Sequence, residues 1–432
     1  MQIGNQNNPF QSNLPVAFGD SVNLDAFGRL RTSTAKTLFD SQQEYGLNLR
    51  FWDITANGTL GTMSSNGSVT NGSNAVGPTN IDTRMTPITV SSTNGDYSIL
   101  QSRQYTRYIP AKSQVVFITG IFASGSGATA NIVRRTSTSG SAVDTVVPQS
   151  SWNIDKLDGT GISGITVDFT KTQILVIQAQ WLGVGRVIVG FDIDGVIQPA
   201  HQFLNANSLS VPYTQSFNLP IRLEIRNTGV AQSKARVGYF DSANGIFLET
   251  VRVVAGGTIN FICTSAQSES GSEERGLPRS ATNGITTIAV TTRRPVLSIR
   301  PKTTFNSRTN RGHIELADYL IRASTNDALY EVVVGGTLTG AAFTSVDADS
   351  IVEYDISATA ISGGMSVITG YATSGTGSTA GQTSGTVDTR NPLVLSQIDA
   401  LTATQTPFTI VCTSFTGTSN ITSAINWHEQ VI

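Results

Sequence analysis

The chain has 432 residues, of which 13% are Asp, Glu, Lys or Arg, about half the share found in an ordinary soluble domain. Its 28 basic and 30 acidic residues give a formal net charge of -2, which argues against a nucleic-acid-binding protein because such proteins carry a basic excess. Hydrophobic residues make up 39%, so a packed interior is expected rather than general disorder. A surface so poor in charge is typical of a protein covered by neighbouring subunits, but also of secreted β-proteins and of soluble chains with Ser- and Thr-lined strands.

Residues 1–38 show neither helical nor strand periodicity, and turn formers separate their large side chains. This pattern predicts an extended N-terminal arm that binds a neighbouring subunit, with a frayed terminus as the alternative. The candidate contact residues are Phe10, Phe18, Phe27, Arg29 and Arg31. The segment lacks the cationic start and apolar core of a signal peptide. No stretch approaches ~18 consecutive apolar residues, so no membrane span is expected.

Residues 39–266 contain many short apolar or alternating runs bounded by turn residues, which predict a jelly-roll-like antiparallel β-sandwich. The runs 172–181 and 186–193 form a predicted hairpin, and Asp194-Gly195 predicts the next turn. Residues 221–226 alternate between aliphatic and charged side chains, as one strand with two different faces does. Asn244-Gly245 predicts another hairpin. Only 34–45 and 391–400 are candidates for short helices.

A Gly-, Ser- and charge-rich linker is expected at 267–284, followed by a second β-sandwich domain at 285–432. Polar stretches at 55–80 and 374–385 predict surface loops or flexible insertions. Cys263 and Cys412 each lie in an apolar run and are expected as buried free thiols, with a disulfide between them as the alternative.

Several local motifs are shared with one known family. The most specific is Asp25-Ala-Phe-Gly-Arg-Leu-Arg-Thr-Ser followed by Phe39-Asp-Ser-Gln-Gln, and further motifs lie at 134–140, 147–161, 181–187, 219–229 and 294–302. Together they resemble the virion structural proteins of tailed bacteriophages over most of the chain. The resemblance implies a place on the head or the tail of the particle and supplies no catalytic residue.

No catalytic, metal-binding or cofactor-binding pattern is found in the sequence. The three histidines are isolated, and no nucleophile elbow or phosphate-binding loop occurs. Asp192-Ile-Asp194-Gly195 predicts a β-turn rather than a calcium loop, because the later acidic ligands are missing. Asp155 and Asp158 beside Trp152 predict a structural turn, with a sugar contact as the alternative. We therefore expect that the protein is not an enzyme and that it binds no metal ion and no cofactor.

One segment carries a local excess of positive charge, with no acidic residue before Glu315. Its basic residues are Arg293, Arg294, Arg300, Lys302, Arg308 and Arg311. The segment is a candidate docking surface for an acidic neighbouring subunit, since guanidinium groups pair well with carboxylates. One alternative is a solvated strand face whose acidic partners come from elsewhere in the fold. A weaker alternative is a contact with nucleic acid.

These patterns lead to a functional prediction. We expect a non-enzymatic virion structural protein of a bacteriophage, tail-associated as an adaptor, fibre-anchoring or baseplate component. The alternatives are a head decoration or minor capsid protein, and a receptor protein that binds a host surface glycan. The expected partners are other virion proteins and further copies of the chain, as in a trimer.

Overall fold

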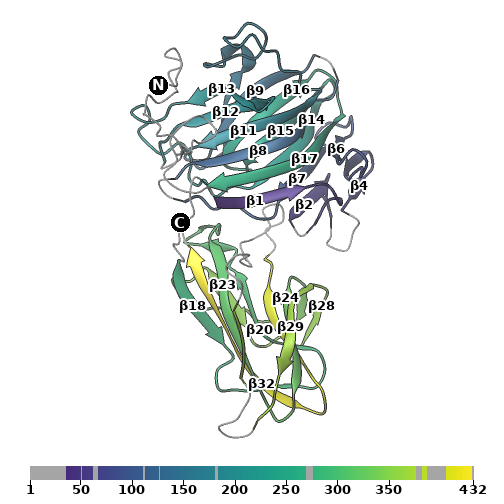
Figure 1. Ribbon diagram of the computed structural model, residues 1–432, viewed down its shortest axis with the longest axis vertical. Helices are drawn as coiled ribbons and strands as arrows, with labels where there is room; N and C mark the ends of the chain where they lie inside the picture. The colour runs from purple at the N-terminus through teal and green to yellow at the C-terminus, as the bar shows by residue number, and fades with distance from the viewer. Residues whose placement is uncertain are drawn as a thin grey trace, which may run out of the picture. The chain divides into compact units, whose positions relative to one another are not determined.

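The computed structural model describes residues 36–49, 51–61, 67–109, 112–125, 127–180, 183–268, 276–375, 382–386 and 405–430. The chain divides into two compact units, unit 1 (Met1–Ser272) and unit 2 (Glu273–Ile432). Both are antiparallel β-structures, and the described residues contain one short 3-10 helix, η1 (Gln149–Ser151), and no α-helix (Figure 1). Nothing helical in these ranges is long and apolar enough to cross a membrane.

Unit 1 contains two large sheets in its described residues. The first has nine strands, in the order β13 (Val196–Phe203), β12 (Val187–Ile193), β11 (Thr172–Ala179), β8 (Gln114–Ile121), β17 (Gly257–Ser268), β6 (Thr86–Val90), β5 (Asn74–Val76) and β4 (Val69–Asn71), with β1 (Lys36–Gln42) also paired to β17. The second has eight, in the order β10 (Val143–Pro148), β9 (Thr129–Thr136), β16 (Gly245–Arg252), β15 (Gln232–Phe240), β14 (Ile221–Gly229), β7 (Tyr97–Ser102), β2 (Trp52–Ala56) and β3 (Thr59–Leu60). The two sheets share one hydrophobic core, which confirms the predicted jelly-roll-like sandwich.

The predicted hairpins form in unit 1. Strands β11 and β12 pair along their length, and Asp194 and Gly195 have φ values of 54° and 82°, as a tight type I′ turn requires. Strands β15 and β16 also form a hairpin, but its turn differs from the predicted one. The Asp241 amide donates to the Asn244 carbonyl (2.9 Å) and Phe240 pairs with Gly245, so residues 241–244 form the turn and Gly245 already belongs to β16.

Strand β1 contradicts the short helix predicted at 34–45, and it begins inside the predicted arm at 1–38. Phe39 packs edge-on against Trp52 of the opposite sheet (ring centroids 5.6 Å apart), and the Trp52 indole donates to the Ser41 hydroxyl (2.8 Å). These contacts between sheets fix the segment as a strand, which local periodicity could not reveal. The polar stretch 55–80 likewise contains β3, β4 and β5 rather than loop alone.

Unit 2 is a second sandwich with its own core. One sheet has five described strands: β18 (Leu277–Thr282), β32 (Ser419–Gln430), β23 (His313–Ser324) and β30 (Gln382–Thr386) in order, with β19 (Ile288–Val290) also paired to β32. The other has six: β26 (Thr344–Ser345), β27 (Val352–Asp355), β20 (Arg294–Pro301), β31 (Phe408–Ser414), β24 (Ala328–Val334) and β29 (Met365–Ala372). Two small hairpins are β21 (Thr304–Phe305) with β22 (Arg308–Thr309), and β25 (Thr337–Thr339) with β28 (Ala360–Ser362).

The core of unit 2 joins its two sheets through buried aromatic and aliphatic side chains. Tyr319 of β23 and Tyr330 of β24 lie with their rings 5.7 Å apart and their hydroxyls 3.3 Å apart. Strand β18 lies within the predicted linker at 267–284 and pairs with β32, so the sandwich includes residues before 285. The helix predicted at 391–400 falls outside the described residues.

Candidate assembly surfaces

The predicted arm contacts cannot be placed. Phe10, Phe18, Phe27, Arg29 and Arg31 all lie in residues 1–35, outside the described ranges.

The basic segment is distributed over several places in unit 2. Arg293 forms an ion pair with Glu331 (2.7 Å), and Arg300 pairs with Glu353 (2.6 Å). The Arg300 guanidinium also lies over the Phe343 ring, 3.7 Å from its centroid. For these two arginines, the acids therefore come from other strands, β24 and β27.

The remaining basic side chains are spread along the same segment. Arg294 donates to the Ala289 carbonyl (3.1 Å), and the Lys302 ammonium donates to the Ser350 carbonyl (2.5 Å). Arg308 is exposed on β22, and Arg311 is half-buried. Arg300 thus reaches Glu353 in β27 and Lys302 reaches the loop before β27, while Arg293 reaches Glu331 in β24.

A buried ionic network on the eight-stranded sheet was not anticipated from the sequence. Glu224 is 2% exposed and accepts hydrogen bonds from Arg222 (2.9 Å from Nε) and Arg236 (3.2 Å). Arg236 also donates to Glu249 (2.8 Å), which in turn accepts from Lys234 (3.1 Å). Burial raises the pKa of Glu224, but the surrounding arginines outweigh burial and lower it to about 2.

Aromatic rings extend this network. The Arg222 guanidinium lies 5.5 Å from the centroid of Phe240, while Arg236 and Arg135 lie 5.4 and 5.1 Å from that of Phe247. Both rings are fully buried in a cluster separate from the main core. Cation-π contacts and ion pairs thus neutralise these charges within the sheet, where Arg222, Glu224 and Glu249 are buried.

The turn that contains Trp152, Asp155 and Asp158 has a structural role, as predicted, rather than the alternative role of a sugar contact. Trp152 is 4% exposed, stacks on Phe191 (6.4 Å) and donates its indole hydrogen to the Val147 carbonyl (3.2 Å), so its ring face is not open to a sugar. Asp155 accepts hydrogen bonds from the backbone amides of Leu157 (2.9 Å) and Ser163 (2.7 Å). Its carboxylate therefore closes a loop.

The described residues offer little for metal or nucleophilic chemistry. They contain no group of His, Cys, Asp and Glu side chains that could hold a metal ion. Burial lowers the pKa of His201 to about 4, so its imidazole is neutral at pH 7. The Nδ1 atom of His201 accepts a hydrogen bond from the Asn153 backbone amide (3.3 Å). Both Cys263 and Cys412 are free thiols, so the alternative of a disulfide between them is wrong; Cys412 is buried as predicted, whereas Cys263 is half-buried.

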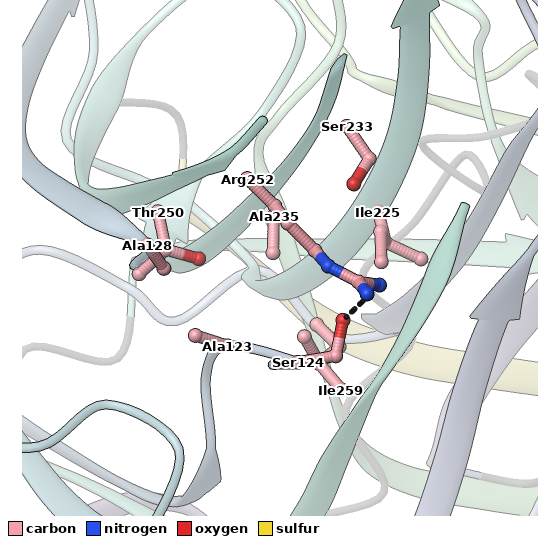
Figure 2. Close-up of a pocket in the computed structure, with 9 residues that line it drawn as sticks. All are labelled: Ala123, Ser124, Ala128, Ile225, Ser233, Ala235, Thr250, Arg252 and Ile259. Carbon is pink, nitrogen blue, oxygen red and sulfur yellow. Dashed lines mark hydrogen bonds between the residues drawn. The ribbon is translucent and has the colours of Figure 1, made fainter. Parts of the chain in front are cut away.

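A small cavity in the described part of unit 1 lies near Arg252 and is shown in Figure 2. The Arg252 guanidinium extends across it and donates to the Ser124 hydroxyl (3.3 Å), while Ile225 and Ile259 form part of its apolar wall. Its volume of about 10 Å³ is near the lower limit for a single water molecule. The cavity is too small for a sugar ring.

Two loops of unit 1 carry exposed aliphatic side chains, which we call the aliphatic loop surface. Its members and their exposed fractions are Val184 (38%), Leu204 (62%), Leu209 (38%) and Val211 (56%). The loops are held together because the Tyr213 amide donates to the Gly183 carbonyl (2.9 Å) and the Asn205 side chain donates to Gly185 (2.7 Å). Arg134 in β9 donates to the same Asn205 side chain (2.5 Å). Hydrogen bonds therefore fix the two loops that carry these exposed apolar side chains.

Sequence reasoning missed this surface, although a signal was present. The segment 204–212 is a run of residues between two strands in which aliphatic side chains occur without periodicity. Such a run predicts a loop, and large apolar residues in a loop are unusual unless they are buried or contact a partner.

Comparisons with known proteins give little further information. No protein-family model and no curated protein matches the sequence. A lectin from Bauhinia forficata in complex with GalNAc is 9% identical, with a TM-score of 0.16, over 56% of this chain and 100% of the lectin chain. The structure of infectious bursal disease virus Gx strain is 9% identical, with a TM-score of 0.15, over 92% of this chain and 73% of the viral chain. At these scores neither similarity carries an argument about what this chain binds.

Proposed function

We propose that this chain is a non-enzymatic structural protein of a bacteriophage particle that assembles with neighbouring subunits and is associated with the tail. The observation that carries the proposal is the aliphatic loop surface. Exposed aliphatic groups on loops that are fixed by hydrogen bonds cost little conformational entropy when a partner covers them. Burial of apolar area contributes about 25 cal/mol per Å², so such a surface favours association.

The placement of charge supports the same function. Arg222 and Glu224 in unit 1 are buried, and Arg293 and Arg300 in unit 2 are paired within their sandwich. A chain that has few charges and neutralises several of them internally leaves a surface dominated by hydroxyl, amide and aliphatic groups. Depletion of charged residues is a feature of the core of protein interfaces.

Substitution of the aliphatic loop surface tests the proposal. We expect Leu204→Ser combined with Val211→Ser to leave the protein folded and to reduce its incorporation into purified particles at least about tenfold. Val230→Ser is the matched control, because Val230 is 91% exposed in another loop of unit 1. Incorporation is measured by quantitative mass spectrometry of the particles. Equal incorporation of the double variant and the control would contradict the proposed role of this surface.

Cryo-electron microscopy of the intact particle tests the location. A few copies around the tail axis are expected for an adaptor, fibre-anchoring or baseplate component. Many copies over the head lattice would instead identify a head decoration or minor capsid protein. Absence of the chain from purified particles would contradict a virion function altogether.

A further inference from the structure

Two exposed aromatic rings lie together in unit 2. Tyr371 at the end of β29 is 64% exposed and Phe415, directly after β31, is 56% exposed. Their ring centroids are 5.7 Å apart and their planes are inclined by 36°. Strand β24 lies between β29 and β31, with Leu329 in register with both Tyr371 and Thr413. Among the exposed large hydrophobic residues in the described part of unit 2, these two alone are aromatic.

Polar groups connect the segments that carry the two rings. The Asp327 carboxylate accepts hydrogen bonds from the backbone amide (2.5 Å) and hydroxyl (2.8 Å) of Ser374, three residues after Tyr371. The Asp327 carbonyl accepts from the Phe415 amide (3.0 Å). Asp327 is thus bonded to both ring-bearing segments, which holds the pair in place.

The connection between β23 and β24 is also anchored. The Asn326 side chain donates to the Thr418 carbonyl (2.9 Å), and the Ser419 hydroxyl donates to the Asn326 carbonyl (2.6 Å). Thr325 has a φ of 104°, a conformation that a β-branched residue rarely adopts. Strained backbone of this kind persists where surrounding contacts enforce it, and it is concentrated at binding sites.

The chemistry of this cluster matches a sugar better than other ligands. A pyranose ring has an apolar C–H face, which packs on aromatic rings, and hydroxyl groups, which bond to carboxylates and amides. A carboxylate fixed beside the two rings adds a hydrogen-bond acceptor, which sugar hydroxyl groups satisfy and a purely apolar contact does not. Rings 5.7 Å apart are in contact with each other, so no quaternary ammonium group fits between them.

We infer that Tyr371 and Phe415 form a platform for one hexopyranose unit of a glycan, with the Asp327 carboxylate as an acceptor for its hydroxyl groups. Only one oxygen of Asp327, Oδ1, takes part in the bonds to Ser374; within the described residues Oδ2 has no hydrogen-bond partner. Hydrogen bonds from Ser374 lower the pKa of Asp327 below the ordinary value, at which an aspartate is already ionised at neutral pH. The inference is independent of the assembly role of unit 1.

Saturation-transfer NMR on the full chain tests the inference. The probes are glucose, galactose, N-acetylglucosamine and N-acetylgalactosamine, with choline as the probe for an ammonium site. We expect at least one sugar to bind with a Kd of the order of 1 mM, as a small exposed site allows. Tyr371→Ala and Phe415→Ala should each weaken that binding at least about tenfold, while Tyr371→Phe retains it.

Matched controls separate the site from general effects. Tyr45→Ala removes a tyrosine that is 92% exposed in unit 1 and should leave sugar binding unchanged. Circular dichroism and calorimetry should show all variants folded, since the substituted rings are largely exposed. Failure of all four sugars to bind, unchanged binding after Tyr371→Ala, or binding of choline alone would each overturn the inference. Incorporation into particles is a separate readout, so failure of the assembly role would be recognised independently.

Discussion

Replacing Glu224 with glutamine removes the central negative charge of the buried network while keeping the shape of the side chain. The carboxylate lies among Arg222, Arg226 and Arg236, with nitrogen–oxygen distances of 3.5 Å to Arg226 and 3.2 Å to Arg236. Its pKa falls from 4.5 to about 2 in the folded protein, because the arginines outweigh the effect of burial. Since one pKa unit corresponds to about 1.4 kcal/mol, the folded state gains about 3 kcal/mol from the ionised carboxylate.

We therefore expect Glu224→Gln to lower the free energy of unfolding of unit 1 by about 3 kcal/mol, the range measured when one partner of a buried ion pair is removed. For a unit of this size the melting temperature should fall by roughly 6–12 °C. Differential scanning calorimetry measures the change. Glu331→Gln is the control, because its partner Arg293 is 39% exposed and such pairs contribute at most about 1 kcal/mol.

The same carboxylate predicts a dependence of stability on pH. Its pKa is lower in the folded protein than in the unfolded chain, so its contribution is complete above pH 4.5 and is lost as the pH falls towards 2. The wild-type protein should therefore lose more stability between pH 5 and pH 2.5 than Glu224→Gln does. A variant destabilised by less than about 1 kcal/mol, with the same acid profile as the wild type, would refute the reasoning.

Four further predictions concern residues 1–35, Phe39 in strand β1, a loop and a thiol. Deletion of residues 1–35 should leave the protein folded and reduce its incorporation into particles. In contrast, Phe39→Ala should destabilise unit 1 by ~3 kcal/mol in chemical denaturation, because the Phe39 ring packs on Trp52. Asp155→Asn keeps one of two acceptor oxygens and should cost ~1–2 kcal/mol by the same assay; an unchanged midpoint would contradict its role in closing the loop. Burial raises the pKa of Cys412 to about 12, so a thiol reagent should label it only after unfolding, as mass spectrometry of the labelled peptides can check.

Much of the β-architecture could be predicted from local sequence. Alternation and turn residues identified the β11–β12 hairpin and the Asp194-Gly195 turn, because a strand places successive side chains on opposite faces and a type I′ turn needs two positive φ values. Local pattern failed at 34–45. There the strand conformation depends on two contacts that local sequence does not show. Strand β1 pairs with β17, which is distant in the sequence, and Phe39 packs against Trp52, which lies on the opposite sheet.

The sequence by itself determined that the chain is an all-β protein of low charge in which charged residues alternate with aliphatic ones in some strands. Only the tertiary structure decided which charges are buried and what they pair with. Because side chains alternate along a strand, the sequence shows that Arg222 and Glu224 lie on the same face of β14. Whether these two side chains are buried depends on the side chains of the neighbouring strands β7 and β15. Arg293 and Arg300 find their acids 38 and 53 residues later, because antiparallel pairing brings β24 and β27 into the sheet of β20. Electrostatic partners are set by distance in space, which the order of residues along the chain does not contain.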